Sequence, residues 1–294
     1  MRFEEFVKKA KEWMQDWLGT DAQVRTKMMR KNNGAAYTGL HDESREVSAV
    51  IYLEPIYQKY LENGETEEAF EKAMEEIKER YGKADRGEEI RRLLKGFGNF
   101  ETVKGNLAFR LVSQAKNREL LRDIPHVDFL DLAVVFEVYL GLDGKNAYSI
   151  VITNEDMNTW NMDAEELYRT AMANAPIVKP ASLRGLKEAL GVRNAEGERE
   201  MFYVLTNEPA AYGAAAMLYE GVLRKASNQL GGDLVILPSS IHEVLLAPWI
   251  SKTDSRAMKE IVRRVNETEV PDEEQLSDHV YWYIRSEDRI EIAE

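Results

Sequence analysis

The chain contains no cysteine and only four histidines, and both scarcities limit its chemistry. The lack of cysteine excludes disulfide bonds and thiolate zinc sites. No apolar run approaches the roughly 18 residues that span a bilayer, and the charged N-terminal segment lacks the apolar stretch of a signal peptide. Together these features predict a cytoplasmic protein that does not enter the membrane.

The sequence also lacks the short motifs that mark common catalytic and nucleotide sites. It has no GxGxxG or Walker loop between a strand and a helix, no GxSxG elbow and no HExxH pair. Its formal net charge is −13, so a phosphate backbone would be repelled. We therefore expect no general nucleic-acid binding, no cofactor and no metal.

What is present is the composition of a folded protein: of 294 residues, 44% are hydrophobic and 31% charged. In the first third, apolar spacing predicts helices over 3–18 and 66–81. Asn32-Asn33-Gly34 predicts the turn of a hairpin, because asparagine and glycine tolerate positive φ. The segment 82–99 predicts a short helix between glycine-marked turns and a boundary between two parts of the chain.

The rest of the chain predicts a second series of hairpins and helices. The run 130–140 predicts a central strand, and we expect Glu137, the one charged residue in 132–140, to face solvent. Asp143-Gly144 predicts a hairpin turn, and the segment 103–113 is consistent with either a strand or a helix. Further predictions are a helix 164–174 ended by Pro176 and Pro180, a helix 182–190, paired strands 202–206 and 213–219, a helix 221–230, and strands 234–237, 242–247 and 279–284.

The whole pattern predicts an α+β fold with mostly antiparallel sheets covered by amphipathic helices. It forms two sequential blocks, an N-terminal helix-hairpin-helix block over 1–99 and a C-terminal α+β block over 100–294. A single continuous domain is the alternative.

Two predicted strand ends share the tripeptide Thr-Asn-Glu, at 153–155 and 206–208. One hypothesis places the side chains of Asn154 and Asn207 in a common ligand pocket, together with Tyr212. The simpler interpretation is that Thr-Asn-Glu suits the end of a strand, because asparagine accepts turn geometry.

The segment 238–243 gathers serine, histidine and glutamate. Ser240 and His242 would point the same way on an extended strand, so a hydrolase could use them as nucleophile and base. A tight turn over Pro238 and Ser239 explains the same residues without catalysis. We therefore place Ser239, Ser240 and His242 in a candidate ligand-binding surface and assign no catalytic residue.

His126 and Asp128 share one face of a predicted strand and could contribute two ligands to a metal. Asp123 and Asp131 lie nearby in the chain as further candidate ligands. A metal site needs three or four ligands in fixed geometry, and the four histidines could meet only through the tertiary structure. The metal-dependent enzyme is kept only as an alternative hypothesis.

Several longer stretches resemble an uncharacterised family of bacterial proteins, found largely in gut Firmicutes. They are VDFLDLAVVFEVYL, the segment from SIVITNEDMNTW to AMANAP, the segment from MFYVLTNEP to EVLLAP, and EQLSDHVYWY, with FVKKAKEWM and NNGAAYTGL near the N-terminus. The resemblance covers nearly the whole chain, and the second half is also similar to another uncharacterised family of Bacillus type. Both resemblances imply a bacterial protein with one continuous architecture, and neither implies an activity.

The first functional hypothesis is therefore a non-enzymatic binding or adaptor protein. The second is a hydrolase using Ser240 and His242, or a metal enzyme using His126 and Asp128. The third is a component of a mobile-element or phage-defence system that binds another protein through the acidic helix 66–81. The oligomeric state cannot be predicted from the sequence.

Overall fold

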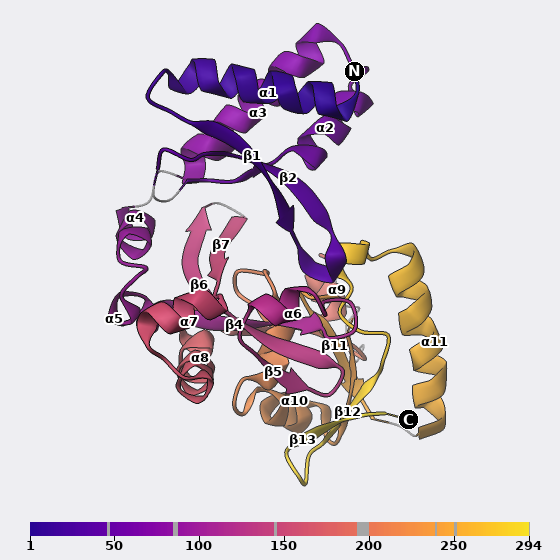
Figure 1. The fold of residues 1–294 in the computed structure, drawn as a ribbon. Helices are drawn as coiled ribbons and strands as arrows, with labels where there is room; N and C mark the ends of the chain where they lie inside the picture. The colour runs from indigo at the N-terminus through magenta and orange to yellow at the C-terminus, as the bar shows by residue number, and fades with distance from the viewer. Residues whose placement is uncertain are drawn as a thin grey trace. The chain divides into compact units, whose positions relative to one another are not determined.

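The structure is a computed structural model that describes residues 1–45, 48–84, 88–143, 146–192, 200–238, 240–249 and 252–293. The chain divides into two compact units. Unit 1 contains Met1–Lys31 and Ala35–Phe97, and unit 2 contains Asn32–Gly34 and Gly98–Glu294. Both combine helices with antiparallel strands, which confirms the α+β class (Figure 1).

Unit 1 joins one hairpin to helices. In Figure 1, α1, α2 and α3 gather at one end of the β1–β2 ribbon. The core lies at that end, because Val24 and Leu40 are buried whereas Met28, farther along β1, is 62% exposed. The elements are α1 (Phe3–Leu18), β1 (Val24–Arg30), β2 (Ala36–Asp42), β3 (Ile51–Tyr52), α2 (Leu53–Glu62), α3 (Glu67–Ala84) and α4 (Glu88–Lys95).

The predicted helices and hairpin of this unit are confirmed. Along α1, Phe6, Ala10 and Met14 are buried at intervals of four residues, which places them on one face of a helix. Gly19 ends α1 with φ of 90°, a conformation that costs glycine little. The strands β1 and β2 pair from Val24–Asp42 to Arg30–Ala36 around the predicted Asn-Asn-Gly turn.

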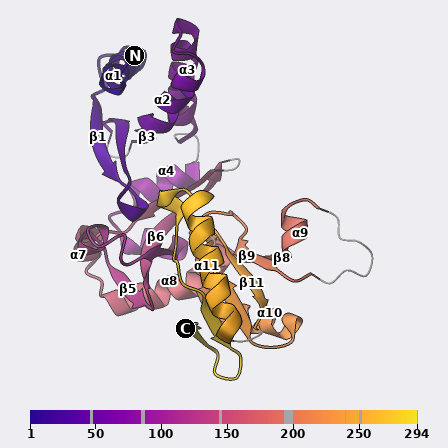
Figure 2. The same cartoon turned by 90° about the vertical axis from the view of Figure 1, so that its right-hand side faces the viewer.

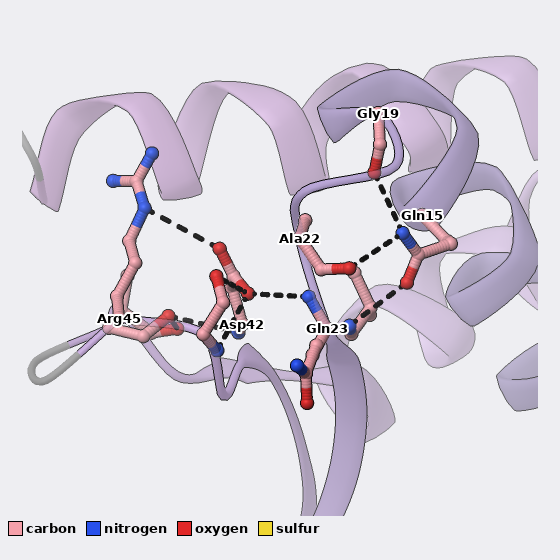
Figure 3. A network of polar contacts seen from close by, with 10 residues as sticks. Gln15, Gly19, Ala22, Gln23, Asp42 and Arg45 are labelled. Carbon is pink, nitrogen blue, oxygen red and sulfur yellow. Dashed lines mark hydrogen bonds and ion pairs between the residues drawn. The ribbon is translucent and has the colours of Figure 1, made fainter.

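A polar network fastens the end of α1 to the hairpin (Figure 3). The Gln15 side chain donates to the Gly19 carbonyl at 2.8 Å and the Ala22 carbonyl at 3.0 Å, and accepts from the Val24 N–H at 3.0 Å. The buried Asp42 carboxylate accepts from the Gln23 N–H at 2.9 Å, and its other oxygen lies 3.5 Å from Arg45 Nε. These bonds satisfy backbone groups that a chain reversal would otherwise leave unpaired.

Unit 2 contains two sheets. In the first, β6 pairs with β4, β5 and β7, all antiparallel, which confirms the prediction of a central strand. The segment that sequence left open between strand and helix forms β4. The elements are η1 (Asn32–Gly34), α5 (Phe100–Val103), η2 (Lys104–Asn106), β4 (Leu107–Ser113), α6 (Leu120–Asp123), β5 (His126–Phe129), β6 (Leu132–Asp143), β7 (Asn146–Val151), α7 (Asn154–Trp160) and α8 (Ala164–Val178).

The second sheet has six antiparallel strands in the order β13-β12-β10-β11-β9-β8. Val262 of α11 packs against Val235 and Ala247 of this sheet, and Figure 2 shows α11 crossing it. The elements are β8 (Ala181–Gly185), α9 (Leu186–Ala189), β9 (Tyr203–Asn207), η3 (Gly213–Leu218), α10 (Val222–Leu230), β10 (Leu234–Leu237), β11 (Val244–Pro248), α11 (Lys252–Thr268), η4 (Asp272–Glu274), β12 (Tyr281–Ile284) and β13 (Arg289–Ile292).

Three local predictions in this unit were wrong. The segment 213–219 forms the 3₁₀ helix η3 instead of a strand, and it contacts β4 of one sheet as well as β9 and β11 of the other. Of the predicted helix 182–190, only Leu186–Ala189 is helical, as α9; residues 181–185 form β8, because pairing with β9 outweighs their helical pattern. Pro176 lies inside α8, which ends two residues later at Val178.

The expected turn at Asp143-Gly144 falls partly outside the described residues, because residues 144 and 145 are not described. Among the described helices, none is long and apolar enough to cross a membrane.

Candidate functional site

A buried ionic cluster lies on the β4–β6 pair. Ala108 pairs with Glu137 and Arg110 pairs with Val135. Paired residues of antiparallel strands project to the same face, and so do residues two apart along a strand. Glu137 and Arg110 are therefore diagonal neighbours on one face of the sheet.

Lys179 completes the cluster from the residue that follows α8. Its Nζ lies 2.7 Å from Glu137 Oε1, and the two side chains are 1% and 0% exposed. The expectation that Glu137 faces solvent was therefore wrong. Periodicity predicts the face on which a side chain lies, but the partner that allows burial stands 42 positions away in the chain.

The charges of the two cations keep Glu137 ionised. Burial by itself raises the pKa of the Glu137 carboxyl, but the positive charges of Lys179 and Arg110 more than offset it, so the pKa lies below its ordinary value. The Arg110 Nε is 3.5 Å from Glu137 Oε2. Two positive charges thus face one negative charge in a largely desolvated place.

Several polar groups of the cluster have unused hydrogen-bonding capacity. Glu137 Oε2 and the Tyr219 hydroxyl are buried, and neither has a hydrogen-bond partner among the described residues. Burial, with the nearby Glu137 charge, raises the pKa of Tyr219. The Arg110 side chain is 12% exposed, and its guanidinium donates no hydrogen bond to the residues that the structure describes. A group that supplies acceptor atoms would satisfy it.

The ring of Tyr212 covers Arg110, with the guanidinium carbon 4.3 Å from the ring centre, a distance suited to cation–π attraction. A tight loop holds this tyrosine. Asn207, at the end of β9, accepts from the Ala211 N–H at 3.1 Å and donates to the Ala211 carbonyl at 3.0 Å. Ala210 and Tyr212 have φ of 51° and 53°, a strained region for residues other than glycine.

The imidazole of His242 borders the same loop. Its Nδ1 accepts from the Tyr212 N–H at 3.2 Å, and its Nε2 lies 3.8 Å from Glu274 Oε1. Burial, helped by the Lys179 charge and opposed by nearby glutamates, holds the pKa of His242 below its ordinary value. The Ser240 hydroxyl accepts from the His242 backbone N–H at 3.0 Å, so this bond does not bring the serine to the imidazole as a nucleophile–base pair requires.

The predicted site residues separate into groups. Hydrogen bonds join Tyr212 and Ser240 to His242, and Asn207 bonds to Ala211, the neighbour of Tyr212 in the chain. Ser239 lies outside the described residues. Asn154 is the first residue of α7, after the cap Thr153, and its side chain donates to the Arg122 carbonyl at 3.1 Å. Over the described ranges, no hydrogen bond or ion pair joins Asn154 to the other group.

A pocket of about 420 Å³ lies beside α6 and β5. His126 and Asp128 both line it, with His126 Nε2 4.0 Å from Asp128 Oδ1. The His126 Nδ1 is 3.1 Å from the Ile124 carbonyl. Within the described part of the chain, no group of three or more acidic or histidine side chains could hold a metal ion.

Sequence reasoning did not select Arg110 or Lys179. A usable signal was present, because each is a lone cation between apolar neighbours, in Ala-Phe-Arg-Leu-Val and in Ile-Val-Lys-Pro. A cation at such a position is expected either to expose its charged group to solvent or to be buried with an oppositely charged partner.

Comparison with known proteins places the chain in a family. The model for the family of unknown function DUF5688 matches residues 3–285, so the chain belongs to this family. No curated protein and no solved structure matches the chain.

Proposed function

Because this family membership assigns no chemistry, we propose that the protein is a non-enzymatic binding protein that receives the carboxylate group of a small ligand beside Arg110 and Lys179. The observation that supports the proposal is the buried cluster itself, in which two cations face the single carboxylate of Glu137. A ligand carboxylate would balance the second cation.

The geometry of Arg110 favours a planar anion. Tyr212 covers one face of the guanidinium, so its edge remains to donate parallel hydrogen bonds. Arginine binds carboxylates through such paired bonds, and these are stronger than neutral hydrogen bonds. Lys179 reaches Glu137 with one bond of 2.7 Å, and an ammonium group has three donors.

The strained loop supports binding at this place. Asn207 and His242 hold the backbone of residues 211 and 212, so the Tyr212 ring stays over Arg110 before any ligand arrives. Such preorganisation lowers the entropy that binding costs. The hydrolase hypothesis has less support, since the Ser240 hydroxyl is engaged by a backbone N–H. Binding of another protein through the acidic α3 stays a prediction from the sequence.

A titration of the full chain with acetate and benzoate tests this proposal. Binding is measured by calorimetry and by the melting temperature, and the control is the same measurement in sodium chloride at the same ionic strength. We expect both carboxylates to bind and to raise the melting temperature, because a ligand of the folded state stabilises it. Arg110→Lys keeps the charge beside Glu137 but loses the planar fork, so it should weaken binding about tenfold or more.

Arg169→Lys is the matched control. Arg169 is exposed on α8 and forms no ion pair with the described residues. The Arg169→Lys chain should bind acetate and benzoate with the affinity of the unsubstituted chain. Equal affinity of the Arg110→Lys chain and the unsubstituted chain, with melting temperatures that agree in the absence of ligand, would contradict the proposal.

A further inference from the structure

The pocket beside α6 carries a second inference, independent of the function proposed above. We propose that it binds the phosphate group of a small molecule through Arg118 and Arg122. Its volume of about 420 Å³ falls in the range of pockets for small ligands. It is lined by Gln114, Ala115, Arg118, Leu121, Arg122, His126, Asp128 and Asp131.

The two arginines are uncommitted. Both are exposed, and among the described residues neither guanidinium forms an ion pair or a hydrogen bond with a side chain. They stand four residues apart, Arg118 in the turn before α6 and Arg122 within it. Each guanidinium therefore has its hydrogen-bond donors available to a ligand.

The acidic residue Asp131 does not neutralise them. Its Oδ2 is 2.6 Å from the Ser277 hydroxyl and 3.2 Å from His279 Nδ1, and its Oδ1 accepts from the Tyr281 hydroxyl at 2.8 Å. Both carboxylate oxygens are thus engaged by Ser277 and His279, which precede β12, and by Tyr281, its first residue. Asp131 therefore does not serve as an acceptor for Arg118 and Arg122.

The other acidic residue, Asp128, lies near His126. Its Oδ1 is 4.0 Å from His126 Nε2, and its side chain is 76% exposed. An exposed carboxylate of this kind is screened by water. The pocket therefore has nominally balanced charge but presents two free guanidinium groups.

Two free guanidinium groups match a phosphate better than a single carboxylate. A phosphate monoester carries close to two negative charges at neutral pH and has three acceptor oxygens, and arginine binds phosphate through paired hydrogen bonds. Leu121 and Ala115 add apolar surface for the organic part of the ligand. Asn154 fits as a positioning residue, because its bond to the Arg122 carbonyl fixes the backbone that carries one guanidinium.

The full chain is titrated with inorganic phosphate and with phenyl phosphate, and binding is measured by calorimetry and by the melting temperature. Sodium chloride at matched ionic strength corrects for screening. We expect both phosphates to bind, with phenyl phosphate the tighter. Arg118→Gln and Arg122→Gln should each weaken binding about tenfold or more, while Arg169→Gln and Arg110→Lys keep the affinity of the unsubstituted chain.

Failure of both phosphates to bind would overturn the assignment, as would equal affinity of Arg118→Gln, Arg122→Gln and the unsubstituted chain. Loss of phosphate binding in Arg110→Lys alone would place the phosphate at the other cluster and would also overturn it. If the protein sediments with phosphatidate vesicles but binds neither inorganic phosphate nor phenyl phosphate, the ligand is a membrane surface and the small-molecule assignment is rejected. Because the two sites are tested by different variants, either proposal can fail while the other stands.

Discussion

At the scale of single residues, the pair formed by Glu137 and Lys179 is a costly way to fill a core. Removing both charges from water costs several kcal/mol for each ion, and attraction between them often only offsets that cost. The pair is 0% and 1% exposed, so stability alone is weak grounds for its presence. Its clearest structural effect is that the Glu137 carboxylate holds Arg110 under Tyr212.

Asp42 is a second buried charge, but backbone groups surround it. Burial by itself raises the pKa of Asp42. Hydrogen bonds from Gln23 and Ser44 and the charge of Arg45 lower this pKa, and together they outweigh burial, so the pKa lies below its ordinary value of 3.8. A lowered folded-state pKa means that the ionised form stabilises the fold above the unfolded pKa, and that this contribution is lost as pH falls through the folded pKa.

We therefore predict that Asp42→Asn lowers the free energy of unfolding at pH 7 by about 1–3 kcal/mol, since hydrogen bonds to a charged acceptor are lost. Urea denaturation measures the change. The difference from the unsubstituted chain should shrink below about pH 4. Asp21→Asn is the control, because Asp21 is exposed and has no hydrogen bond or ion pair to the described side chains. A pH-independent difference would show that Asp42 acts without its charge.

At the scale of elements, η3 explains how two sheets and the candidate site are joined. Residues 213–217 are all buried, and the three consecutive alanines let neighbouring backbones approach closely. Gly213 has the tightest position: a Cβ there would lie 2.1 Å from Thr206 Oγ1, 2.5 Å from the His242 carbonyl oxygen and 2.7 Å from the Asn207 N. Two of these three atoms belong to the backbone and cannot rotate away.

Gly213→Ala should therefore displace the loop that carries Tyr212. We expect a loss of about 1–3 kcal/mol in unfolding free energy, typical of overpacking, and weaker carboxylate binding. Gly232→Ala is the matched control, because a Cβ there meets nothing within 4 Å, and its effect should stay within about 0.5 kcal/mol. Unchanged stability and binding in Gly213→Ala would refute the role given to this close approach.

At the scale of the whole molecule, we propose that the predicted blocks 1–99 and 100–294 behave as two domains. One buried apolar cluster draws all its residues from between Phe6 and Tyr81, and two others draw theirs from between Val112 and Ala293. A substitution in one core should then destabilise mainly its own unit.

Hydrogen exchange of the full chain tests this proposal. Phe6→Ala, at a residue with 0% exposure, should cost about 3–5 kcal/mol locally and accelerate amide exchange in residues 1–31 and 35–97. Phe136→Ala, equally buried, should accelerate exchange in residues 98–293. Faster exchange throughout the chain in both variants would indicate one cooperative domain.

The sequence by itself determined the features that depend on neighbours in the chain. The apolar spacing of α1 and α3, the Asn-Asn-Gly turn, the run that forms β6 and the α+β class all follow from local periodicity and turn chemistry. The family resemblance also needed only the order of residues, and the match over residues 3–285 bears it out. Cytoplasmic location stays a prediction.

Only the tertiary structure decided where the charged and small residues go. Glu137 is buried because Lys179 and Arg110 come to it from other elements, and the segment 213–219 becomes a 3₁₀ helix because it contacts strands of both sheets. The pocket places His126 and Asp128 beside two arginines that no motif relates to them. Burial energies and ion pairs depend on partners that are distant in sequence, so local pattern could not supply these features.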